Sequence, residues 1–355
     1  MKKITKLGLS ALCGSLAMAS AANAGDISVS GSAEITYLTA DGNTTGHPFG
    51  MKSNLGFSGS GELDGGQKVA LTIDNSDKSV FSAASIALTT NNIGKFTISN
   101  GSGADLGDYD DKAPTAWEEA WDGGQGATTD KVSGVAGSTN INWKSPATTG
   151  KIMGGTTLIL AYAPRNDGVQ NNDKASSGSS SIEKGMDVIL DLRSGKKLSG
   201  FIGYSRTMRP YDGAKSNYAL PSGHKEEAAI GLNYKLGPFS MGYQHTAEDL
   251  KAQSVGKARE VDMYLNNSWG VAMNINGGLS VSYGEAASNK IWTTTTGAHK
   301  ATKYTQKRKQ KSKAWNAAYT IGGVTAKWSN AETTNAAYSE GSRKEATLLS
   351  LGIAF

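Results

Sequence analysis

The sequence has little cysteine and no long apolar run. Cys13 is its single cysteine among 355 residues, and it lies in an N-terminal segment that we expect to be removed. The mature chain then has no disulfide and no cysteine-based metal site. Apolar residues make up 38% of the chain, and no run of them approaches the ~20 residues of a membrane-spanning helix. These absences exclude a disulfide-stapled domain and a bundle of transmembrane helices.

A strong charge of either sign is also missing. The chain has 36 basic and 31 acidic residues, a formal net charge of +5. Without Lys2, Lys3 and Lys6, which lie in the same N-terminal segment, 33 basic residues remain and the net charge falls to +2. The charge therefore does not indicate nucleic-acid binding.

No arrangement of residues typical of catalysis or of a cofactor is visible. The histidines, His47, His224, His245 and His299, are scattered without metal-ligand spacing. The aspartates at 105, 108, 110 and 111 could offer oxygens to calcium, but they lack the order of an EF-hand loop. We therefore predict no enzyme activity, no cofactor and no metal.

The N-terminal segment has the pattern of a secretory signal peptide. Residues 1–24, "MKKITKLGLSALCGSLAMASAANA", begin with lysines, continue with an apolar stretch and end on Ala22, Asn23 and Ala24. Such a small-residue end fits cleavage, whereas a buried or membrane-spanning N-terminal helix would be longer and would not need it. The pattern predicts export and a mature chain of residues 25–355.

Apolar residues alternate with small or polar ones along most of the mature chain. The segments that show this best are "DISVSGSAEITYL" (26–38), "GMDVILDL" (185–192), "AAIGLNYKL" (228–236), "GLSVSYGEA" (278–286) and "LLSLGIAF" (348–355). Side chains of a strand point alternately to opposite faces, so a period of two indicates strands with one apolar face. The expected fold class is all-β.

The connections between these segments are of two lengths. Tight turn signals occur at 64–66, 92–94, 194–197, 236–238, 276–278 and 322–323, with 145–153 as a further turn, and long polar stretches occur at 164–183, 207–224 and 288–310. A soluble sandwich would not need this asymmetry. Short turns at one end and long loops at the other are typical of a transmembrane antiparallel β-barrel, here of about sixteen strands. The N- and C-terminal strands would close it, because lipid leaves no backbone group without a partner.

Several segments resemble the Gram-negative trimeric porins, most of all those of alphaproteobacteria. The matching residues are "DISVSGSAEITY" at the mature start, "NLGFSGSGELDGGQKVALTID" (54–74), "IALTTNNIGKFTISNG" (86–101) and the final Phe355. The resemblance is good over the first 145 residues and the last dozen. It implies a homotrimer in the outer membrane that passes small hydrophilic solutes by diffusion. It also implies that Phe355 is an assembly signal read by the outer-membrane insertion machinery. A structural or adhesive barrel acting through its long loops is the alternative.

The family folds its third long loop into the barrel, and the corresponding stretch here is about 101–138. This stretch is rich in acids: Asp105, Asp108, Asp110, Asp111, Glu118, Glu119 and Asp122. A solvated surface loop is the other interpretation of such a charged segment. Trp117 and Trp121, four residues apart, could form a short helical turn within it.

The basic side of the expected pore differs from the family pattern. Enterobacterial members carry wall arginines at two places where this chain has Asn54 and Asn100. Lys52 remains as an inward-facing cation, with Lys68, Lys95 and Lys327 as further candidates. An acidic loop without an equal number of basic residues on the opposite wall predicts a preference for cations.

A basic stretch precedes one of the last expected strands. Lys307, Lys309, Lys311 and Lys313 continue the face that carries Trp315, Ala317, Tyr319 and Ile321. If the strand extends beyond the membrane, these lysines lie outside the barrel at headgroup height above an aromatic girdle. That arrangement would bind the phosphates of lipopolysaccharide. A disordered basic loop is the alternative.

Overall fold

The computed structural model describes residues 23–41, 47–77, 82–101, 103–127, 129–150, 153–166, 184–208, 224–251, 260–294 and 304–354. Apart from Asn23 and Ala24, the expected signal peptide lies outside these residues, and so does Phe355. Within the described segments, no helix is both long and apolar enough to cross a membrane.

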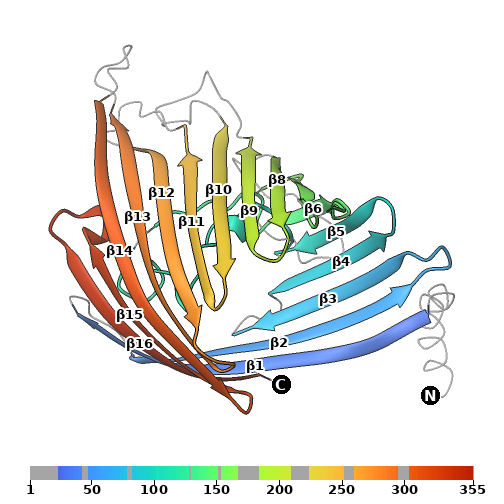
Figure 1. Cartoon of the computed structure of the whole chain (residues 1–355). Helices are drawn as coiled ribbons and strands as arrows, with labels where there is room; N and C mark the ends of the chain where they lie inside the picture. The colour runs from blue at the N-terminus through green and yellow to red at the C-terminus, as the bar shows by residue number, and fades with distance from the viewer. Residues whose placement is uncertain are drawn as a thin grey trace, which may run out of the picture.

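Sixteen antiparallel strands close into one barrel, as Figure 1 shows. They are β1 (Asn23–Asp41), β2 (Phe49–Glu62), β3 (Lys68–Ser76), β4 (Ala83–Thr90), β5 (Gly94–Asn100), β6 (Thr139–Lys144), β7 (Thr157–Ala163), β8 (Gly185–Ser194), β9 (Leu198–Thr207), β10 (Lys225–Leu236), β11 (Phe239–Asp249), β12 (Glu260–Asn274), β13 (Leu279–Thr294), β14 (Tyr304–Ile321), β15 (Val324–Thr334) and β16 (Arg343–Ala354). Each strand pairs with its sequence neighbours, and β1 pairs with β16 from Ser32 opposite Ala354 to Asp41 opposite Glu345. The predicted fold class, strand number and closure by the terminal strands are confirmed.

The short connections lie where the turn signals predicted them. For example, β10 and β11 are joined through Gly237, and β14 and β15 through Gly322 and Gly323, all three with positive φ. Glycine suits such left-handed positions because it has no Cβ to clash. One expected long loop is largely wrong, since β13 runs to Thr294 and β14 begins at Tyr304, so most of the stretch 288–310 is strand.

The outer face of the barrel is apolar. On β16, Leu349, Leu351 and Ile353 are 46%, 55% and 48% exposed, whereas Ser350 between them is 7% exposed and faces inward. The same alternation leaves Ile27, Val29 and Ile35 of β1 and many other aliphatic side chains exposed on the outside. An apolar band of this kind is stable in contact with lipid, where the closed ladder satisfies every backbone group.

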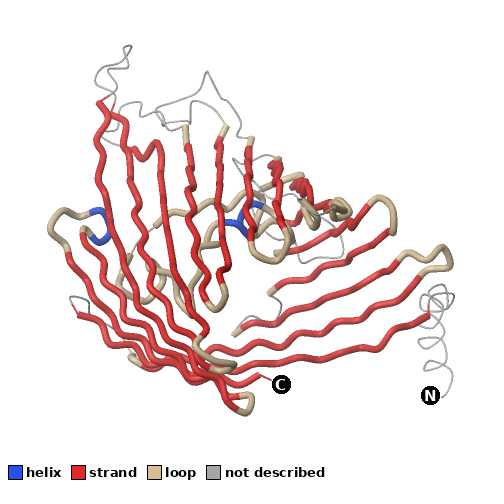
Figure 2. The backbone as a smooth tube through the Cα atoms, viewed as in Figure 1, coloured by secondary structure: helices blue, strands red, loops and turns tan. Residues whose placement is uncertain are grey.

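The inner face is polar and is partly covered by the chain itself. Residues 101–138, called the inner loop from here on, connect β5 to β6. The described part of this loop runs inside the ring of strands and is visible behind β10 to β13 in Figure 1, and in tan behind the same strands in Figure 2. A short 3₁₀ helix, η1 (Leu106–Tyr109), lies in this loop, and a second one, η2 (Ala336–Tyr338), lies between β15 and β16. The buried apolar clusters of the described residues form where the inner loop meets the wall.

Candidate functional site

Two wall carboxylates hold the two ends of the inner loop side by side. Asp187 Oδ2 on β8 accepts hydrogen bonds from the amides of Leu106 (2.9 Å) and Val135 (3.1 Å). Glu227 on β10 accepts from the amides of Ser133 (2.7 Å) and Gly134 (3.1 Å). Backbone amides bonded to a carboxylate make stronger hydrogen bonds than neutral pairs do, so these contacts fix the loop on the wall.

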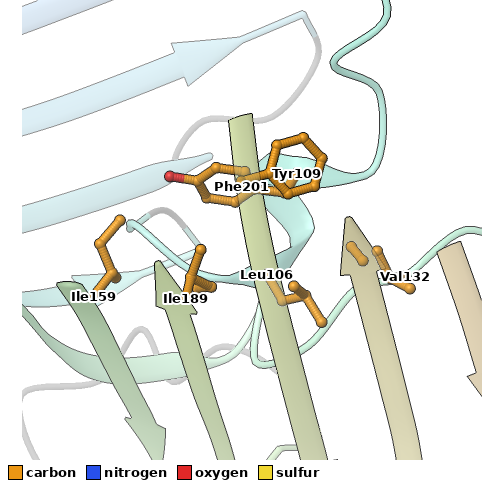
Figure 3. Close-up of a cluster of buried hydrophobic side chains, with 7 residues drawn as sticks. Leu106, Tyr109, Val132, Ile159, Ile189 and Phe201 are labelled. Atoms are coloured by element: carbon orange, nitrogen blue, oxygen red, sulfur yellow. The ribbon is translucent and has the colours of Figure 1, made fainter. Parts of the chain in front are cut away.

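An apolar contact reinforces this attachment. Leu106, Tyr109 and Val132 of the inner loop pack on Ile159 of β7, Ile189 of β8, and Phe201 of β9 and Ala229 of β10, as Figure 3 shows for the six labelled residues. The rings of Tyr109 and Phe201 have centroids 4.9 Å apart. Burial of a Leu, Ile, Val or Phe side chain is worth roughly 1.5–3 kcal/mol, so this contact adds to the attachment of the loop near β7 to β10.

The middle of the inner loop crosses β11 to β14 on polar wall side chains. Gln244 Nε2 donates to the carbonyls of Tyr109 and Asp110, and Gln244 Oε1 accepts from the amide of Lys112. Asn316 Nδ2 on β14 donates to the carbonyl of Glu118 at 2.9 Å, and Ser282 Oγ on β13 accepts from the amide of Ala116 at 2.8 Å. The loop backbone therefore finds its partners on the wall.

A row of small wall residues lies beneath the same part of the loop. In register across the strands these are Gly242, Gly270, Gly284, Ala314, Ala331 and Ala346. The loop approaches so closely that a Cβ built on Gly270 would lie 2.2 Å from the carbonyl oxygen of Pro114. Farther along, Trp121 packs on Ala314 and Ala331. Larger wall side chains would hold the loop farther from the wall.

The acids from Asp110 to Asp122 come together inside the barrel. Lys131 Nζ lies 3.8 Å from Asp110 Oδ2 and 3.1 Å from Asp122 Oδ2, and it also lies over the ring of Trp121. Lys112 Nζ lies 4.0 Å from Asp111 Oδ1. The loop thus carries more acids than the lysines beside them can neutralise.

Asp105 and Asp108 differ from the other predicted acids of the loop. Asp105 is buried, and its Oδ1 accepts a hydrogen bond from the amide of Gly107 at 3.0 Å, which caps η1. Asp108 lies in a hollow of about 280 Å³ together with Lys112 and Arg193. Asp105 therefore has a structural role, and Asp108 lies beside two basic groups and a second acid, Asp191.

Burial changes the ionisation of these acids. Loss of solvation raises the pKa of Asp110 to about 7 and the pKa of Glu119 to about 8, with neighbouring carboxylates adding to both shifts. It also raises the pKa of Asp105 to about 8 and shifts the pKa values of Asp108 and Glu118 upward. Desolvation disfavours the charged form of a carboxyl group, so Asp105, Asp110 and Glu119 hold a proton for part of the time near neutral pH.

Basic groups face the loop from the strands near the barrel seam. Lys327 Nζ on β15 lies 2.8 Å from Glu34 Oε1 on β1 and 5.1 Å from the ring centroid of Trp117. Lys52 on β2 is opposite Glu34 in register and shares its inner face. Asn54 follows on the same face, where Ser76 Oγ donates to its Oδ1 at 3.3 Å. The strand alternation also places Lys68 and Lys95 on the inner face.

Asn100 does not join this set. Asn100 lies two residues after Ile98 on β5, and residues two apart on a strand share a face. Ile98 and its partner Ile86 face outward, so Asn100, which pairs with Ala84 and Thr139, also faces outward. Thr139 Oγ1 donates to Asn100 Oδ1 at 3.3 Å. The expectation that Asn100 lines the pore fails because β5 ends on an outward-facing residue.

The predicted helical turn at Trp117 and Trp121 is also wrong. Residues 116–122 form bends and turns, and the helix of this loop is η1. Ser282 and Asn316 of the wall bind the backbone at Ala116 and Glu118, and the segment makes a single turn of its own, in which the amide of Asp122 donates to the carbonyl of Glu119 at 3.0 Å.

The basic stretch of β14 faces outward. Lys307, Lys309, Lys311 and Lys313 are exposed and alternate with buried, inward-facing Gln310 and Ser312. Trp315 follows on the outer face, with its ring 4.5 Å from that of Tyr283. Lys313 Nζ lies 3.0 Å from Glu332 Oε2, which is part of an outer hollow of about 430 Å³ that also includes Lys309 and Lys311.

The wall residues that hold the inner loop were not identified from the sequence. Asp187 was visible as a polar residue on an alternating strand, but nothing in the sequence pairs it with Leu106 and Val135. The same holds for Glu227 and Gln244. Among the described residues, no group of three or more His, Cys, Asp or Glu could hold a metal ion.

Comparison with solved structures supports the fold. OmpF of Salmonella typhi in complex with daunomycin matches with a TM-score of 0.62 and 13% identity, covering 93% of this chain and 98% of that one. The anion-selective porin of Comamonas acidovorans has a TM-score of 0.60 and 15% identity, with 93% and 99% covered. A loop-deletion mutant of OmpT, an outer membrane protein of Vibrio cholerae, has a TM-score of 0.63 and 11% identity, with 94% and 100% covered.

Comparison with curated protein sequences gives no match. A sequence profile described as "Gram-negative porin" matches residues 8–326, which is most of the chain. Together with the closed barrel, this match indicates an outer-membrane channel. The chain belongs to the Gram-negative porin family.

Proposed function

We propose that this porin passes ions and small hydrophilic solutes by diffusion, that the inner loop narrows its lumen, and that the acids of the loop favour cations. The observation that carries the proposal is the position of Asp110, Asp111, Glu118, Glu119 and Asp122 on a segment bound to the inner wall. Charges beside a narrow aqueous passage act on an ion at short range, where low-dielectric walls focus the field.

The balance of charge around the loop supports the sign of the preference. Around the middle of the loop lie six acids, Glu34 and the five from Asp110 to Asp122, and four lysines, Lys52, Lys112, Lys131 and Lys327. Because the pKa values of Asp110 and Glu119 are raised to about 7 and about 8, the full acidic excess is reached only above these values. Two unit charges at about 4 Å and an effective dielectric near 20 interact by roughly 4 kcal/mol, and about 1.4 kcal/mol is already a tenfold bias. The anion-selective Comamonas porin shares the fold at 15% identity, which says nothing of the charges on this loop.

The test is the zero-current potential across a salt gradient for Glu118→Gln, Glu119→Gln and Asp122→Asn combined. Loss of three acids from the loop should move this potential toward zero or to the sign of anion selectivity. A matched control removes three outer-face acids, Glu285, Glu332 and Glu345, by substitution to Gln, and should leave the potential unchanged. An unchanged potential in the loop variant would refute the role of these acids.

We also propose that the chain is exported through a cleaved signal peptide, that the outer-membrane insertion machinery assembles it, and that it forms a homotrimer. The N-terminal pattern and the family support this, and OmpT of Vibrio cholerae, which shares the fold, is described in a trimer form. The purified protein should run on a gel as a trimer that heating dissociates. The mass of its chain should be that of residues 25–355, beginning at Gly25. A monomer before heating would contradict the assembly, and a mass including residues 1–24 would contradict cleavage.

The outer lysines support a further partner, the phosphates of lipopolysaccharide. Lys307, Lys309, Lys311 and Lys313 form one outward column above the aromatic pair of Tyr283 and Trp315. Each basic residue near an anionic membrane surface is worth about 1 kcal/mol.

Changing all four lysines to Gln should weaken binding of lipopolysaccharide at low salt. The matched control makes the same change at the inward-facing Lys52, Lys68, Lys95 and Lys327, and it should bind as the unmodified protein does. Equal binding by the outer variant and the unmodified protein would show that the column is only solvated.

A further inference from the structure

The side chain of Gln244 on β11 makes three hydrogen bonds to the inner loop, which covers it. Its side chain is fully buried, Nε2 donates to the carbonyl of Tyr109 at 3.1 Å and to that of Asp110, and Oε1 accepts from the amide of Lys112 at 2.6 Å. Both ends of one amide are therefore used on the backbone that carries Asp110 and Asp111. No other residue type offers two donors and an acceptor at this length.

Two glycines next to Gln244 let the loop approach the wall at the same point. A Cβ built on Gly242 would lie 2.6 Å from Cδ of Pro114, and one built on Gly270 would lie 2.2 Å from the carbonyl oxygen of Pro114. The second contact is with backbone, so the loop itself would have to move if a side chain were added. From the neighbouring strand β10, Asn233 Nδ2 donates to the carbonyl of Lys112 at 2.9 Å and so binds the same part of the loop.

We propose that Gln244 is a positioning residue for ion selectivity: it fixes Asp110 and Asp111 at the edge of the passage while Gly242 and Gly270 keep the loop against the wall. The proposal rests on the function proposed above, because it assumes that the acids of the loop act on passing ions. It adds that a buried wall residue, several strands from the seam, determines where those acids lie.

The first variant is Gln244→Met, which keeps the length of the side chain and removes its hydrogen bonds. Three backbone groups of the loop then lose their partners, which is costly for buried polar groups. We expect the segment around Asp110 to become mobile and the zero-current potential to shift toward zero. The matched control is Gln310→Met, since Gln310 is equally buried but bonds to Thr129 Oγ1 and the amide of Ala337, away from these acids.

A second measurement reports the position of the loop separately from ion selectivity. A spin label on Lys112→Cys, in a chain with Cys13→Ser, reports the mobility of the segment directly. In the Gln244→Met background the label should become more mobile, and with Gln310→Met it should not. If the label becomes more mobile while the zero-current potential does not change, Gln244 positions the loop but the loop acids do not set selectivity. If neutralising the acids shifts the potential but Gln244→Met changes neither readout, the positioning role is wrong.

Gly270→Ala tests the close approach independently of hydrogen bonding. The added methyl group should push Pro114 into the lumen and lower the single-channel conductance. Gly352→Ala is the control, because its Cβ would meet ordinary contacts of 3.6 Å or more and no atom of the inner loop. Equal conductance of the Gly270→Ala and Gly352→Ala channels would overturn the claim that Gly270 keeps the loop against the wall.

Discussion

Asp110 and Glu119 are the two acids of the proposed passage whose pKa values lie near neutral pH. Their pKa values, raised to about 7 and about 8 by burial, lie close to the pH of ordinary solution measurements. A carboxyl group of ordinary pKa would be fully charged there and would not respond. The charge of the inner loop therefore changes over the range in which channels are studied.

Cation preference should increase as the pH rises from about 6 to about 9. Below the raised pKa values these two groups hold a proton and are neutral, and above them they are charged, so the loop becomes more negative as the pH rises. The measurement is the zero-current potential in a fixed salt gradient as a function of pH. Asp110→Asn with Glu119→Gln should flatten the curve, and a preference that declines with rising pH would contradict the assignment.

The predicted site residues show how far single residues can be assigned from sequence. The loop acids could be grouped by composition alone, because seven carboxylates within one segment are visible without a structure. Asp105 differs because its burial beneath η1 depends on contacts with β8. Asn100 was misplaced because the inward or outward direction of a strand's last residue depends on register, and a shift of one residue reverses it.

At the scale of elements, the inner loop is held by carboxylates on β8 and β10. Glu227 binds Ser133 and Gly134 and is itself paired with Lys225 at 3.1 Å. Hydrogen bonds to charged groups contribute about 1.5–3 kcal/mol each. The loop should therefore open locally, before the strands, when this contact is lost.

Glu227→Ala should speed hydrogen exchange at the amides of Ser133 and Gly134 and leave the strand amides protected. Glu226→Ala is the matched control, because it removes the neighbouring acid on the outer face of the same strand. Exchange that stays slow at both amides in the Glu227 variant would mean that Asp187 and the apolar contact hold the loop without Glu227.

The last strand carries a second prediction at this scale. Leu349, Leu351 and Ile353 are exposed on the outer face, and Phe355, which lies outside the described residues, continues their alternation in the sequence. Deleting Phe355 should lower insertion in cells far more than it lowers the stability of barrel refolded in detergent. Equal losses in both assays would show that the residue acts through stability and is not an assembly signal.

Strands and short turns could be predicted because their signals are local. The period of two follows from strand geometry, and Gly237, Gly322 and Gly323 mark turns that need positive φ. The path of the inner loop could not be predicted in the same way. Its backbone is bound by Gln244, Asn316 and other wall residues far away in the sequence, and no local pattern encodes such contacts.

On the scale of the whole molecule, the two faces of the barrel wall suit different surroundings. Its outer face is apolar and fits lipid, and its mostly polar inner face binds the inner loop along the wall. The column of outer lysines on β14 stands above Trp315, where a membrane would end and headgroups begin. In the proposed function, solutes pass along the inner face and lipid contacts the outer face of the same strands.

The zero-current potential of the unmodified protein, measured in a planar bilayer across a steep potassium chloride gradient, tests the central claim most directly. A water-filled barrel with an acidic inner loop should give discrete conductance steps and a potential of the sign that potassium selectivity produces. A potential of the opposite sign would contradict the role of the loop acids. Protein that inserts without conducting would contradict the channel itself.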